Sequence, residues 1–92
     1  MVTAFVLIHT EASRISDIAQ TIADMPQVAE VFSVTGEYNI IAVLRVSEYE
    51  GLDEAVPSGI ALIPGVTSTT TILAFRRFSR KDLETSYDIG LS

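Results

Sequence analysis

The sequence predicts an α+β fold of the ferredoxin-like βαββαβ class, a four-stranded antiparallel sheet with two helices on one face. Three observations predict it: four β-branched runs, two helical patterns between them, and an internal repeat. Residues 26–28 (Pro-Gln-Val) recur as 64–66 (Pro-Gly-Val), 38 residues later, and the same offset aligns the run from Val2 with the run from Ile40. Two successive β-α-β units give this order of elements. The right-handed crossover rule then places both helices on the same face.

The first half of the chain is predicted to form strand, helix and strand. Residues 2–9 (VTAFVLIH) are β-branched and aromatic, as strands require. Ser13 is a candidate N-cap for a helix whose apolar residues recur at helical spacing. These are Ile15, Ile18, Ala19, Ile22 and Ala23. Pro26 ends this helix because proline disfavours helical geometry at the residue before it, and residues 28–35 form the next strand.

The second half repeats this order with a weaker helix. Residues 40–46 form the third strand, and Ser47 with Glu50 fits a capping box, so a helix should start near Glu48. Residues 57–59 (Pro-Ser-Gly) should break that helix into two short pieces.

A long, threonine-rich fourth strand follows over residues 66–78. After it, Ser79 with Asp82 could cap a short C-terminal helix over about residues 80–88. Residues 1–92 are therefore predicted to form one domain with a helical tail.

Both faces of the predicted sheet are apolar. Alternation along the first strand separates Val2, Ala4, Val6 and Ile8 from Phe5 and Leu7, and the third strand repeats this pattern over residues 40–46. Helices can cover only one face, and leaving the other exposed would forgo several kcal/mol at about 25 cal/mol per Å². We therefore expect a homodimer formed sheet against sheet, and a larger oligomer built from such dimers.

Composition and charge exclude several classes of protein. The formal charge of −6 disfavours direct nucleic-acid binding, which needs clustered Lys and Arg. Four of the six basic residues lie together, and we interpret them as a solvated strand end (Arg76, Arg77, Arg80, Lys81). The apolar stretch 4–8 is too short for a membrane span and lacks a basic leader. We expect a soluble, cytoplasmic protein without a membrane partner.

The sequence contains few residues that are suited to catalysis. With no cysteine and His9 as the lone histidine, no nucleophile–base set can be assembled. The glycines are scattered, so no phosphate-binding loop is formed, and no short-spaced cluster of metal ligands occurs. We interpret His9 as a polar cap at the sheet edge, and we expect no enzyme activity, metal or cofactor.

The stretch VTGEYNI, residues 34–40, is the candidate functional segment. Gly36 and Asn39 suit a tight reversal between two strands, and Glu37 and Tyr38 offer polar atoms at its tip. From the residues alone the segment is either a plain hairpin turn or a turn that holds a ligand.

The order of elements, VTGEYNI and IPGVTSTTTIL (residues 63–73) together resemble the Lrp/AsnC family of regulators. The resemblance covers nearly the whole chain and is to the C-terminal effector module, the RAM domain. Most members of the family carry a helix-turn-helix before this module. Because the first strand begins at Val2, we expect a stand-alone form that lacks this DNA-binding part.

The resemblance implies dimers that assemble into rings and hold amino-acid effectors between dimers. The family's turn, Gly-Asp-Tyr-Asp, falls on Gly36, Glu37, Tyr38 and Asn39. Asn39 departs from it: an aspartate would offer a charge to an α-ammonium group, whereas asparagine offers a neutral acceptor. The strand after Pro-Gly-Val contributes to effector contacts in the family, which makes Thr69 and Thr71 candidates. Their alternative role is structural, since threonine favours strands.

Three functions remain open at this point. The first is a non-enzymatic amino-acid effector and oligomerisation module, able to co-assemble with helix-turn-helix relatives. The second is a dimeric α+β barrel enzyme, such as a cofactor-independent monooxygenase or isomerase. The third is a purely structural assembly module. A deep cavity within one chain would favour the enzyme, and a pocket confined to subunit contacts would favour the effector module.

Overall fold

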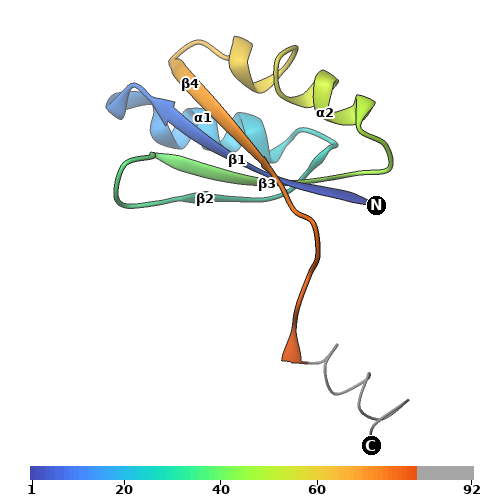
Figure 1. The fold of residues 1–92 in the computed structure, drawn as a ribbon. Helices are drawn as coiled ribbons and strands as arrows, with labels where there is room; N and C mark the ends of the chain where they lie inside the picture. Colours follow the sequence, from blue (N-terminus) through green and yellow to red (C-terminus); the bar gives the residue numbers. More distant parts are fainter. Residues whose placement is uncertain (81–92) are drawn as a thin grey trace, which may run out of the picture.

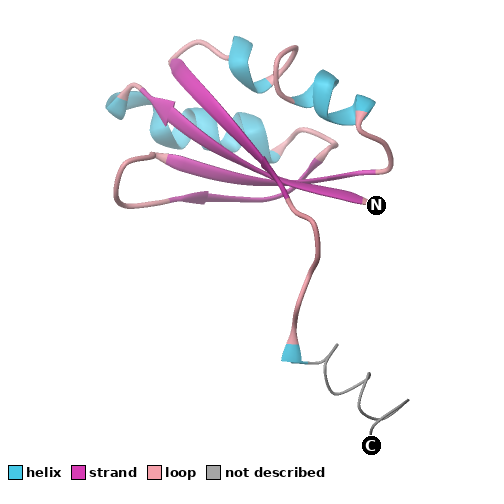
Figure 2. Cartoon of the chain, in the orientation of Figure 1, coloured by secondary structure: helices cyan, strands magenta, loops and turns pink. Residues whose placement is uncertain are grey.

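The computed structural model describes residues 1–80 and has the predicted order of elements. They are β1 (Val2–Thr10), α1 (Ile15–Ala23), β2 (Val28–Ser33), β3 (Ile40–Val46), α2 (Glu50–Ala55) and β4 (Val66–Leu73). The four strands form one antiparallel sheet in the order β2-β3-β1-β4. Both helices lie on the same side of it (Figure 1). The ferredoxin-like βαββαβ class is confirmed, and Figure 2 shows the two layers.

Neither helix begins with the predicted cap. Ser13 lies inside a 3-10 turn, Ala12–Arg14, and Arg14 occupies the N-cap of α1 without a side-chain hydrogen bond. Tyr49 is the N-cap of α2, again without a side-chain bond, so the Ser47–Glu50 capping box is wrong. A cap contributes only about 1 kcal/mol. Apolar residues packed against the sheet therefore decide where these helices start.

The predicted break in the second helix is confirmed. α2 ends at Ala55, and a 3-10 turn, Ile60–Leu62, follows the Pro-Ser-Gly segment. Ala55 and Ile60 are both fully buried, so each of the two pieces packs onto the core.

β4 is shorter than predicted, ending at Leu73 rather than at residue 78. Its partner β1 begins at Val2, and the last link is the Ala74 N–H donating to the Thr3 carbonyl at 3.0 Å. Residues 74–79 then leave the sheet on the side away from the helices (Figure 1). We call residues 74–79 the arm. The helix predicted over about 80–88 lies almost entirely outside the described residues.

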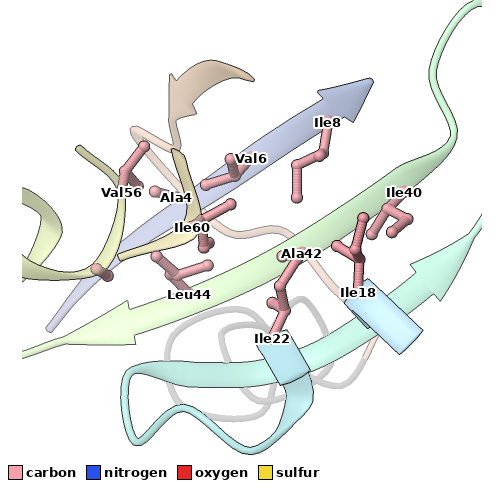
Figure 3. Packing of buried hydrophobic residues seen from close by; sticks show 11 residues of the cluster. Ala4, Val6, Ile8, Ile18, Ile22, Ile40, Ala42, Leu44, Val56 and Ile60 are labelled. Carbon is pink, nitrogen blue, oxygen red and sulfur yellow. The ribbon is translucent and has the colours of Figure 1, made fainter. Parts of the chain in front are cut away.

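One face of the sheet carries the core. Six side chains of the central strands are fully buried: Ala4, Val6, Ile8, Ile40, Ala42 and Leu44. They pack against Ile18 and Ile22 of α1 and against Ile60 beyond α2 (Figure 3). We call this the covered face, and its burial supplies the main stabilisation of the fold.

The opposite face is apolar and uncovered, as the alternation predicted. Phe5 of β1 lies opposite Val43 in the neighbouring strand β3 and opposite Ile72 in the neighbouring strand β4. Phe5, Phe32 and Ile72 are 38%, 49% and 50% exposed. We call this the open face. Phe75 and Phe78 of the arm are also exposed.

Candidate functional site

The turn between β2 and β3, residues 34–39, projects from one end of the sheet. It is closed by the Val34 N–H, which donates to the Asn39 carbonyl at 3.0 Å. Gly36 has a φ of +107°, and a Cβ built on it would meet nothing within 4 Å. Glycine is therefore needed for its backbone angle and not for space. The tip of the turn stands clear of the rest of the chain.

Asn39 ties the turn to the end of β1 through two hydrogen bonds. Its backbone N–H donates to the Ile8 carbonyl at 2.9 Å, and its side-chain Oδ1 accepts from the Thr10 N–H at 2.8 Å. The β1–β3 ladder ends at the pair Ile8–Ile40, so no strand carbonyl of β3 faces Thr10. The Asn39 side chain replaces that missing carbonyl.

This bond determines which polar group of the Asn39 side chain remains available to a ligand. The sequence suggested a neutral acceptor, but that acceptor is already occupied by the Thr10 N–H. The remaining polar group is Nδ2, and within residues 1–80 no atom accepts a hydrogen bond from it. Asn39 therefore presents a donor.

Tyr38 lies against His9, with the ring centroids 4.6 Å apart and the planes tilted by 46°. Such tilted pairs are favourable for aromatic rings. His9 follows the fully buried Ile8 and so belongs to the open-face side of β1, where the Tyr38 ring joins it. His9 is thus part of the turn region and contacts more than solvent at the sheet edge.

The structure brings two of the predicted site residues together with two residues of β1. Tyr38 and Asn39 contact His9 and Thr10, whereas Glu37 is exposed at the tip. Thr10 was not singled out from the sequence. Its position could have been found from topology, because the end of β1 must lie beside the start of β3 in an antiparallel pair.

Thr69 and Thr71 lie elsewhere within one chain. They are opposite Ile8 and Val6 in the β1–β4 ladder, so they share the covered face, while His9 and its opposite residue Ser68 share the other face. Thr69 is half-buried and Thr71 is exposed. Their contribution to a ligand site stays a prediction that concerns an assembly of several chains.

Two surface hollows lie away from the turn. One, of about 690 Å³, separates the arm from the open face and is lined by Thr3, Phe5, Arg45, Phe75 and Phe78 among others. The second, of about 350 Å³, lies between α1 and β2. Neither hollow is lined by a residue of the turn.

Among residues 1–80 no group of three or more His, Asp or Glu side chains is gathered to hold a metal ion. No helix in this range is long and apolar enough to cross a membrane.

The four-stranded antiparallel sheet with both helices on one face defines a small α+β domain of the ferredoxin-like class. Residues 3–83 match the model of the Lrp/AsnC ligand binding domain. The chain therefore belongs to the Lrp/AsnC family, in which this domain is the ligand-binding part.

Two relatives illustrate the match. The HTH-type transcriptional regulator FL11 of Pyrococcus horikoshii is 32% identical over 73 residues, which are 79% of this chain and 48% of that protein. The chain thus spans about half the length of the curated relatives it matches. The crystal structure of TTHA0845 from Thermus thermophilus is 48% identical with a TM-score of 0.82. That comparison covers 87% of this chain and all of the other.

Two more distant structures share the fold and were solved with L-methionine. One is the regulator NMB0573 from Neisseria meningitidis, with 16% identity and a TM-score of 0.77. The other is Rv3291c from M. tuberculosis, with 22% identity and a TM-score of 0.72. Each match covers 86% of this chain and 53% of the other. At these identities the likeness shows the fold alone.

Proposed function

We propose that the chain is a non-enzymatic amino-acid effector-binding and oligomerisation module of the Lrp/AsnC type. The observation that carries this proposal is the match of residues 3–83 to the ligand-binding domain of the family. The two L-methionine complexes of the same fold support an amino acid as the ligand class. We assign the contacts to Gly36, Glu37, Tyr38 and Asn39, with Thr69 and Thr71 added by a neighbouring chain.

The open face supports the homodimer in this proposal. Burying a large apolar side chain such as Phe5, Phe32 or Ile72 stabilises by about 1.5–3 kcal/mol, and a two-fold dimer buries each of them twice. A second copy laid on the open face would also cover Phe75, which is exposed and lines the same hollow as Phe5. Contacts between such dimers would then enclose the turn, which is open in one chain.

Ligand binding at such a contact would control assembly. A ligand held between dimers binds only the assembled form, so by linkage it shifts the equilibrium towards that form. Since the curated relatives include HTH-type regulators, we propose that these are the partners whose assembly the module alters. The net charge of −6 supports a role without direct DNA contact, and regulation of transcription would place the protein in the cytoplasm.

The enzyme alternative is disfavoured by the packing between sheet and helices. A dimeric α+β barrel enzyme needs a roomy cavity in that layer, but Ile8, Ile18 and Leu44 fill it and are fully buried. Among the described residues, the larger hollow lies on the other side of the sheet. The purely structural alternative predicts an assembly that no ligand changes.

The test is the mass of the protein by light scattering during size-exclusion chromatography, with and without each of the twenty amino acids. The proposal expects a multiple of the monomer mass and a further rise with at least one amino acid. The Tyr38→Ala variant should keep the dimer mass and lose the response. An assembly indifferent to all twenty would favour the structural alternative, and a monomer would contradict the use of the open face.

A further inference from the structure

We propose that Asn39 recognises its ligand as a hydrogen-bond donor, so the ligand group bound there is a carboxylate or carbonyl oxygen and not an ammonium group. This inference rests on the proposed function, because it names the chemistry of the ligand at that same turn.

The orientation of the Asn39 amide is set by Thr10. A backbone N–H can be accepted only by the oxygen of a side-chain amide, and it lies 2.8 Å from Oδ1. Turning the amide over would place two donors against each other and leave the half-buried Thr10 N–H without an acceptor, which is unfavourable. The NH₂ end is therefore fixed as the free end.

Every other polar group of Asn39 is already used. Its N–H donates to the Ile8 carbonyl, and its carbonyl accepts from the Val34 N–H. Three hydrogen bonds hold the residue in place, two to the end of β1 and one to Val34 at the start of the turn. Nδ2 is thus a preorganised donor with two N–H groups, and a preorganised group loses little entropy when a ligand binds.

The neighbouring groups fit an acceptor on the ligand. Tyr38, the residue before Asn39, is held by its ring contact with His9, and its hydroxyl is a further group of the turn that can donate a hydrogen bond. An ammonium group has three donors and no acceptor, so it cannot bond to Nδ2. The nearby Glu37 carboxylate is exposed and screened by water, and it remains available to a positive group.

Aspartate at this position provides a matched variant. In Asn39→Asp one carboxylate oxygen can keep the bond to the Thr10 N–H, while the other replaces the NH₂ donor with a charged acceptor. The fold is therefore kept and the polarity offered to the ligand is reversed. Asn39→Ala serves as the structural control, since it removes the bond to the Thr10 N–H and should lower the urea midpoint of unfolding.

The experiment is isothermal titration calorimetry with three probes: L-methionine, 4-methylthio-2-oxobutanoate without the amino group, and 3-methylthiopropylamine without the carboxylate. The wild-type protein should bind the oxo acid within about fivefold of L-methionine and bind the amine at least about tenfold more weakly, since one charge-assisted bond exceeds 1.4 kcal/mol. Asn39→Asp should reverse the order of the two analogues. Glu37→Gln, which alters the turn's charge but not residue 39, should keep the wild-type order.

Two results would overturn the inference. One is a wild-type protein that binds the amine as tightly as L-methionine and rejects the oxo acid; the effector proposal would then stand with the opposite polarity at Asn39. The other is no heat from any probe, which removes the assigned ligand class. In that case the mass response to the twenty amino acids decides whether the effector proposal also falls.

Discussion

Val6 and Phe5 are neighbours in β1, yet Val6 is fully buried and Phe5 is 38% exposed. The covered face has α1 and α2 against it, whereas within residues 1–80 the open face has only the arm on its side (Figure 1). Both faces carry apolar side chains, although the open face also has Thr3 and Arg45, so the presence of hydrophobic residues alone does not show which face is covered within one chain. The covered face stabilises one chain, and the open face remains available for the proposed contact between chains.

The largest effect is expected on the covered face. Leu44→Ala removes three methyl or methine carbons from a fully buried site and should lower the free energy of unfolding by about 2–5 kcal/mol. Urea denaturation followed by circular dichroism measures this loss, which should be the same at all protein concentrations. Ile72→Ala on the half-exposed open face is the control, and its loss should shrink on dilution. If Leu44→Ala and Ile72→Ala lowered the free energy of unfolding equally at high dilution, the distinction between the two faces would be contradicted.

The next effect tests the open face alone. Phe5→Glu places a charge at the centre of that face, where two copies would bring two like charges together without partners. Burying such a charge costs several kcal/mol, so we expect association to weaken by about 3 kcal/mol or more while the circular dichroism spectrum is kept. Light scattering should show half the dimer mass. Ala61→Glu adds the same charge on the helix side, at an exposed residue, and should leave the mass unchanged.

The sequence predicted which face of the sheet a strand residue occupies, because that depends on periodicity. It did not predict hydrogen bonds between residues far apart in the sequence. The alternation in residues 2–9 and 40–46 predicted both faces because the strand period is fixed by covalent geometry. The caps at Ser13 and Ser47 failed because weak local bonds are overridden by packing. Asn39 was placed correctly in the turn, but its acceptor is used by Thr10, 29 residues away in sequence, and residue type alone cannot show that.

Within residues 1–80 two glycines have a positive φ, Gly65 just before β4 and Gly36 in the turn after β2. A Cβ on Gly65 would lie 2.9 Å from Ile18 Cδ1 and 3.3 Å from Arg14 Cβ, so α1 packs directly on it. Gly65→Ala therefore combines a φ of +99° with a steric overlap, and we expect a loss of about 2–3 kcal/mol in urea denaturation. A loss below that of Gly36→Ala would contradict close packing of α1 at this point.

The smallest effect is expected at Gly36, where the backbone needs glycine but no atom lies close. Gly36→Ala should cost about 1 kcal/mol, because an L-residue is strained at a φ of +107°. The difference between the two alanine variants then measures the packing of α1, since both share the backbone strain. Because the turn is tied down at Asn39 rather than at its tip, the loss at Gly36 should leave the Thr10–Asn39 bond intact. Amide hydrogen exchange tests this: the Thr10 N–H should stay protected in Gly36→Ala and lose its protection in Asn39→Ala.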